Sequence, residues 1–117
     1  MRWKKRVKPM CQKSEFEKVC QEDFEQFREI SKRFQKIDMT DIDGLQELTI
    51  DSWLLATRWS EIQSNAVKIA SQYNINKTDF STWAYQKYRQ LQEMHITVRG
   101  WHRQAKDEYK ANLMMEG

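Results

Sequence analysis

Apolar residues in the middle of the chain recur at alternating steps of three and four positions, and Ser52 is the one polar interruption. The members of this stripe are Leu45, Leu48, Leu55, Trp59, Ile62, Ala66, Ile69 and Tyr73. Residues at this spacing lie along one side of a helix, and such a side packs readily against a second helix. The pattern predicts a long amphipathic helix, continuous or kinked, that starts with Thr40 as its cap and reaches Tyr73.

Helical spacing also precedes the stripe. Ser14 and Glu17 form a capping-box pair, which predicts a first helix that runs to about Lys36. We expect its buried side to consist of Phe16, Cys20, Phe24, Phe27, Ile30, Phe34 and Ile37.

After a predicted loop at residues 74–77, Asn76 or Thr78 is placed to cap a third helix. The inward side of this helix would be Phe80, Ala84, Tyr88, Leu91 and Met94, with Trp83 widening it. A β-branched run at residues 96–98, followed by Gly100, interrupts the pattern. We therefore expect a separate fourth helix on Trp101, Ala105, Tyr109 and Leu113.

Composition agrees with helices rather than strands. The chain has 117 residues but only three glycines and one proline, which leaves few positions for the tight turns of a strand-rich fold. We predict an all-α fold: a bundle of about four helices with one long central amphipathic helix. Residues 1–13 form a basic N-terminal tail, and residues 14–117 form a single helical domain.

Charge is unevenly distributed, although the net charge is only +3. Residues 1–13 carry +6, residues 14–51 carry −6, and the remainder carries +3. Such asymmetry indicates either contact with a polyanion or neutralisation of one copy's tail by another copy's acidic helix. The sequence leaves both possibilities open.

Two basic sets are candidate DNA contacts, through phosphate neutralisation and, for one tryptophan, through base stacking. The first set is in the tail and the second near the end of the chain. The residues are Arg2, Trp3, Lys4, Lys5, Arg6 and Lys8, followed by Arg99, Arg103 and Lys106. A solubilising tail and ordinary helix-surface charge are the alternative readings.

Enzymatic motifs are absent from the sequence. Three scattered glycines, Gly44, Gly100 and Gly117, cannot form a phosphate-binding loop or a dinucleotide fingerprint. His95 and His102 have no cysteine or acidic pair at ligand spacing, so we expect no metal and no cofactor. The prediction is a protein without catalysis of its own.

The central stripe needs a cover, which either the chain's own helices or a second copy can provide. We favour self-association and expect its interface at Leu48, Leu55, Trp59, Ile62, Ala66 and Ile69. Trp53, Trp59, Trp83 and Trp101 would be core residues or anchors between subunits.

A family resemblance adds to this reading. Its motifs are Phe27, Ile30 and Phe34, then the acidic turn at residues 37–45, then residues 53–59, and finally residues 88–99. Together they resemble the small terminase subunits of tailed phages, P27 type. Residues 94–98 match the family's late turn in register only, because His95 stands where the family has glycine and Val98 where it has proline.

The resemblance implies a subunit that assembles, recognises viral DNA for packaging and recruits the large terminase subunit. Two cysteines, Cys11 and Cys20, without a secretory segment favour a reducing cytoplasm, which would be that of the host cell if the protein is viral. No apolar segment predicts membrane insertion. Two other functions stay open. One is a small helical inhibitor or adaptor from a mobile element, and the other is a recombination accessory protein that binds single strands.

Overall fold

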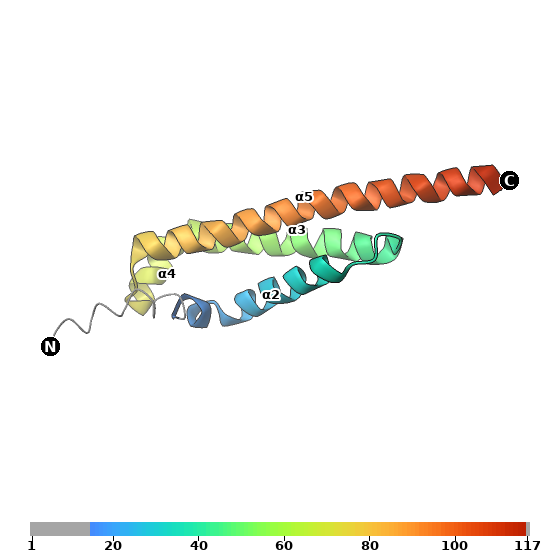
Figure 1. The fold of residues 1–117 in the computed structure, drawn as a ribbon. Helices are drawn as coiled ribbons and strands as arrows, with labels where there is room; N and C mark the ends of the chain where they lie inside the picture. Colours follow the sequence, from blue (N-terminus) through green and yellow to red (C-terminus); the bar gives the residue numbers. More distant parts are fainter. Residues whose placement is uncertain (1–14, 117) are drawn as a thin grey trace.

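Residues 15–116, which the computed structural model describes, form an all-α fold, as the sequence predicted (Figure 1). A helical turn at residues 15–19 precedes α2 (Gln21–Lys36), α3 (Ile42–Ser64), α4 (Ala66–Tyr73) and α5 (Lys77–Glu116). The described residues contain no strand. The proposed tail contacts Arg2, Trp3, Lys4, Lys5, Arg6 and Lys8 lie outside the described residues.

The centre of the fold is an antiparallel pair, α3 and α5, which lie side by side for most of the length of α3 (Figure 1). The central stripe forms the α3 side of this contact, since Leu45, Leu48 and Trp59 have no accessible surface. Phe80, Leu91 and Val98 are equally inaccessible on the α5 side. The periodic apolar positions therefore cover one another within a single chain.

The predicted central helix is broken at one residue. Asn65 ends α3, and its side chain donates from Nδ2 to the carbonyl of Glu61 at 3.0 Å. An asparagine side chain that bonds the preceding turn competes with helix continuation. The stripe continues on the separate helix α4, where Ala66 and Ala70 are buried.

One predicted helix start is confirmed and another is wrong. Asn76 caps α5, because its side-chain oxygen accepts a hydrogen bond from the backbone N–H of Asp79 at 2.9 Å. At α3 the cap is Asp41, which accepts from Gly44 N–H at 3.0 Å, and not Thr40. The Thr40 hydroxyl instead donates to Asp38 at 2.7 Å, within the turn before the helix.

The expected division of the last segment into two helices is wrong, because α5 is continuous over 40 residues. Gly100 lies inside it, and a Cβ there would meet nothing within 4 Å. A helical glycine costs only about 1 kcal/mol. Packing on both sides outweighs that cost: Val98 is fully buried, and Trp101 stacks on Phe34 with 5.2 Å between ring centroids.

Helix α2 covers one flank of the α3–α5 pair through aromatic side chains. The ring centroid of Trp83 lies 5.4 Å from that of Trp59 and 5.8 Å from that of Phe24. Phe16, in the turn before α2, packs edge-on against Phe80 at 5.4 Å. This cluster ties α2 to the long pair at the end where α5 begins.

Candidate functional site

The residues that the sequence assigned to a subunit interface lie inside the protomer. Leu48, Leu55, Trp59, Ile62 and Ala66 are buried by the chain's own helices, and Ile69 is half-buried against the same core. Of the two covers expected for the stripe, the structure has the first, the chain's own helices. In this fold these side chains are not available to a second copy, so self-association remains a prediction that other residues would have to fulfil.

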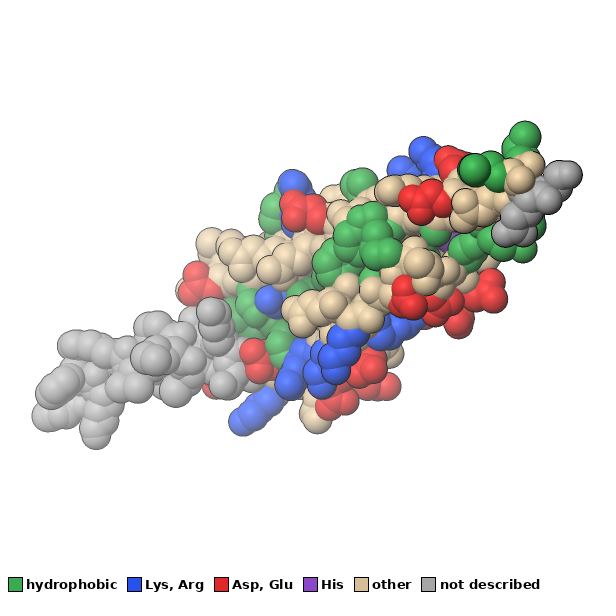
Figure 2. Space-filling view, turned by 45° about the vertical axis from the view of Figure 1, so that its right-hand side comes forward, with side chains coloured by type: hydrophobic (Ala, Val, Ile, Leu, Met, Phe, Trp, Pro, Cys, Tyr) green, Lys and Arg blue, Asp and Glu red, His purple; other side chains and the backbone are tan. Residues whose placement is uncertain are grey.

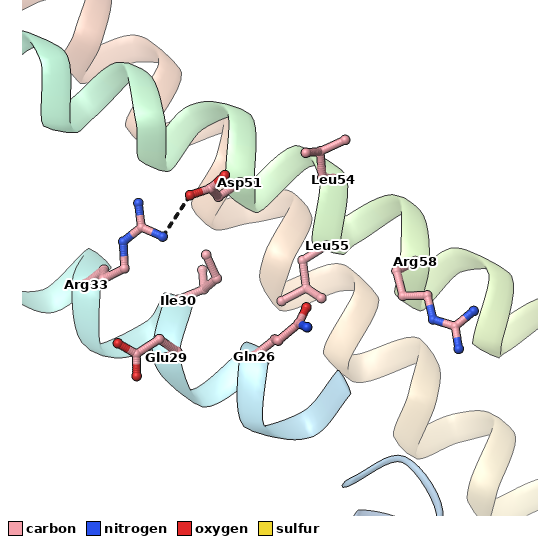
Figure 3. Close-up of a pocket in the computed structure, with 8 residues that line it drawn as sticks. All are labelled: Gln26, Glu29, Ile30, Arg33, Asp51, Leu54, Leu55 and Arg58. Atoms are coloured by element: carbon pink, nitrogen blue, oxygen red, sulfur yellow. Dashed lines mark hydrogen bonds and ion pairs between the residues drawn. The ribbon is translucent and has the colours of Figure 1, made fainter. Parts of the chain in front are cut away.

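A groove between α2 and α3 lies on the covered flank (Figure 3). Ile30 and Leu55 form its apolar floor, and Leu54 stands at its rim. Arg33 reaches from α2 to Asp51 on α3, with 2.9 Å between Nη1 and Oδ2. The groove is small, and an ion pair crosses it. The contacts along it therefore hold α2 against α3.

A second ion pair links the same helices. The guanidinium of Arg58 donates to both carboxylate oxygens of Asp23, at 3.1 and 3.3 Å. The pKa of Arg58 is raised, first by this hydrogen bond to Asp23. Because the arginine side chain is half exposed, this pair adds orientation more than stability.

Cys20 is buried beside this pair, and its environment makes the thiol unreactive. Burial and, to a smaller extent, the negative charge of Asp23 raise the pKa of the Cys20 thiol to about 11, and the positive charge of Arg58 opposes them in part. Since the thiolate is the reactive form, a raised pKa argues against nucleophilic or redox chemistry.

Among residues 15–116, no helix covers the opposite flank of the α3–α5 pair. A groove of about 410 Å³ lies there, and every residue that lines it comes from α3 or α5. The lining residues are Trp53, Ala56, Thr57, Ser60, Tyr88, Gln92, His95, Ile96 and Arg99. The side chains of Trp53 and Ile96 are each 54% exposed.

Trp53 is thus not a core residue, which leaves the other expectation for it, an anchor between subunits, as a prediction. It follows Ser52, which is on the buried stripe, and successive helical positions point about 100° apart. Its offset from the stripe is the signal that sequence reasoning missed.

His95, one of the lining residues, links the two helices of this groove. Its Nδ1 lies 3.0 Å from the backbone carbonyl oxygen of Thr49 across the α3–α5 contact. A carbonyl oxygen only accepts hydrogen bonds, so Nδ1 is the donor and carries the proton. The histidine therefore has a structural partner, and no group of three or more potential metal ligands occurs within residues 15–116.

The second basic set begins at the edge of this groove with Arg99 and continues along α5, where Lys110 extends it. Arg99, Arg103, Lys106 and Lys110 follow one another at steps of four, three and four, which places them on one side of the helix. All four are exposed, and within the described part of the chain none of them forms an ion pair. We call these four residues the α5 basic strip.

The two predicted basic sets are not shown to meet. Phe16, close to the first described residue, packs against Phe80 at the start of α5. Arg103 is 23 residues further along the helix, about 35 Å away at 1.5 Å per residue. The α5 basic strip is therefore a separate candidate contact from the tail residues.

Comparisons with protein-family models, curated proteins and solved structures find no match for this chain. Among the helices of residues 15–116, none combines the length and hydrophobicity needed to cross a membrane.

Proposed function

We propose that this protein is a non-catalytic DNA-binding and assembly subunit. The observation that supports the proposal is the α5 basic strip, in which Arg99, Arg103, Lys106 and Lys110 are exposed on one side of a rigid helix. Carboxylates of α5 lie on other sides or at the edge of the strip, as at Glu108 and Asp107. A row of cations without internal ion pairs suits a polyanion such as the DNA backbone.

The proposed mechanism is electrostatic and independent of sequence. Each phosphate that a lysine or arginine neutralises releases condensed counterions, so affinity falls as salt rises. Four contacts from one chain give weak binding. Several copies on one DNA molecule would raise the overall affinity through effective concentration.

Within this proposal, the motif resemblance to small terminase subunits gives the most specific role. The subunit would engage viral DNA in the host cytoplasm and deliver it to a large packaging subunit. The support for this role is the set of sequence motifs together with an all-α fold.

Fluorescence anisotropy with a labelled 30-base-pair duplex, titrated at several salt concentrations, tests DNA binding. Replacing both Arg103 and Lys106 with alanine should weaken binding and lower the log–log salt slope by about 2, since each lost contact removes about 0.9. Lys68→Ala with Lys77→Ala removes two exposed cations far from the strip and is the matched control. An unchanged slope in the strip variant would exclude the strip as the contact.

A protein-binding adaptor is the second candidate function, and the uncovered groove favours it. Trp53, Ile96 and Arg99 are of the types that dominate protein interfaces, an aromatic and an apolar anchor beside an arginine. Absence of duplex binding at low salt, with the fold intact, would leave this function as the better reading.

A further inference from the structure

Phosphate contacts leave one exposed tryptophan unexplained. Trp53 is 54% exposed in the groove of the open flank, which we call the α3–α5 groove. An indole ring in this position presents a large apolar face to water, and a flat apolar partner would cover that face best. The α5 basic strip, on which the proposed function rests, supplies charge but no such ring.

The α3–α5 groove and the α5 basic strip are one continuous surface, because Arg99 belongs to both. The contact of His95 with Thr49 fixes the register of the two antiparallel helices. Trp53 and Arg99 each lie four residues from this contact, in opposite directions, and are therefore about 12 Å apart along the axis. Arg103 follows about 6 Å further on. An elongated ligand that lies along α5 thus reaches both the ring and the cations.

The charge of the groove favours an anionic occupant. Figure 2 shows acidic side chains beside basic ones at several places on the face that it displays. The α3–α5 groove differs, since its lining includes Arg99 and, among residues 15–116, no carboxylate. Arg99 is exposed, and it forms no ion pair in the part of the chain that the structure describes. Its positive charge is therefore available to an anion.

The other lining side chains suit a nucleobase. Beside the apolar Trp53 and Ile96, the lining contains the hydroxyl groups of Thr57 and Ser60 and the amide of Gln92. A base has an apolar face that stacks and a polar edge that forms hydrogen bonds, so it matches both kinds of lining group. The apolar side of a docked protein helix would instead cover the hydroxyl and amide groups, which costs free energy unless each finds a partner.

A base can stack on Trp53 only where it is unpaired. In a duplex, neighbouring base pairs cover the faces of each base, whereas a base of a single strand can turn out onto an aromatic side chain. We propose that the α3–α5 groove binds an unpaired base of single-stranded DNA, with the adjoining phosphates along the α5 basic strip. This inference rests on the proposed function and specifies the strandedness of its ligand.

Fluorescence anisotropy of the full chain with a labelled thymidine oligomer of about 30 nucleotides tests the proposal, with the labelled duplex measured in parallel. Trp53→Ala should weaken single-strand binding about 5- to 140-fold, the range for one stacked base, and leave duplex binding unchanged. The salt slope should stay the same, because no charge is removed. Trp53→Phe keeps a ring and should retain most of the affinity. Tyr73→Ala removes a similarly exposed ring from α4 and is the matched control.

A second variant tests the groove from its α5 side. Gln92→Glu keeps the size of the side chain but places a carboxylate in the α3–α5 groove, where it should repel the strand and weaken single-strand binding. Gln90→Glu adds the same charge on the side of α5 that faces α2, and it should have the smaller effect. Circular dichroism checks that every variant keeps its helix content.

The outcomes separate this inference from the proposed function. Equal weakening of single-strand and duplex binding by Trp53→Ala, or no weakening, overturns the base contact. If Arg103→Ala with Lys106→Ala still lowers the salt slope on duplex, the proposed function stands without it. A uridine oligomer that binds more tightly, with the same dependence on Trp53, overturns the assignment to DNA in favour of RNA. Absence of binding to single strand and duplex at low salt rejects both proposals and leaves a protein as the occupant of the groove.

Discussion

The two flanks of the α3–α5 pair are formed by the same two helices, but their aromatic side chains are buried on one flank and exposed on the other. On one flank, α2 buries Trp59 and Trp83 beneath Phe24 and Phe27. On the other, Trp53 is more than half exposed beside Ile96. Within residues 15–116, therefore, a covering helix stabilises one flank, and the other flank keeps apolar side chains exposed.

The largest expected effect is on stability, and it should differ between two tryptophans of α3. Trp59→Ala removes a fully buried ring and should lower the free energy of unfolding by about 3–5 kcal/mol. Trp53→Ala, the matched control on the open flank, should cost less than about 1 kcal/mol. Urea denaturation followed by circular dichroism measures both. Equal losses would mean that the open flank is part of the core.

The next effect concerns the reactivity of Cys20 on the covered flank. With its pKa raised to about 11 from the ordinary 9.0, the thiol should be alkylated about 100-fold more slowly than an ordinary cysteine at pH 8. A Cys11→Ser variant isolates the reaction, and the same protein in urea provides the unprotected rate. Fast alkylation of the folded protein would contradict the burial of Cys20 at the start of α2.

The raised pKa also predicts a pH dependence of stability. The unfolded chain loses the Cys20 proton near pH 9 and the folded chain only near pH 11. The contribution of this thiol to stability is therefore complete below pH 9 and declines as the pH rises from 9 to 11. A Cys20→Ala variant should lack this part of the decline in urea titrations.

A smaller effect is expected where α2 turns into α3. Asp41→Ala removes the N-cap of α3 and should cost about 1 kcal/mol. Thr40→Ala, the neighbouring change, leaves that cap in place and should cost about half as much or less. Thermal unfolding of the two variants distinguishes them, and a larger loss for Thr40→Ala would restore the sequence-based assignment of the cap.

The smallest expected effect tests whether α5 is one continuous helix along both flanks. Gly100→Ala has open space for its Cβ and should stabilise the protein by about 0.5–1 kcal/mol. Gly44→Ala should destabilise it, because a Cβ at that position meets the Asp41 carboxylate. Destabilisation by Gly100→Ala would indicate a bend in α5 at this residue.

The sequence predicted the elements better than their limits. The apolar periodicity identified the buried sides correctly at Leu48, Phe80 and Leu91. Gly100 and the β-branched residues before it lowered local helix propensity, but tertiary packing of Val98 and Trp101 outweighed that preference. Asn65 gave no strong signal, since its competing hydrogen bond to Glu61 depends on side-chain geometry.

The candidate site was less predictable than the fold. A periodic stripe shows that Leu55 and Trp59 need a cover, but it does not show which chain provides it. The common side of Arg99, Arg103 and Lys106 could be predicted from the sequence, because helical spacing alone determines it. The groove could not, because it exists only where α3 and α5 meet and α2 does not cover them.

The length of α5 has a hydrodynamic consequence. Forty helical residues form a rod of about 60 Å, nearly twice the diameter of a compact sphere made by a chain of this length. Friction on such a rod slows its diffusion, so a single protomer will elute early in gel filtration and resemble a larger globular species. Its rotational diffusion will be anisotropic, and fluorescence depolarisation or NMR relaxation will report different correlation times along and across α5.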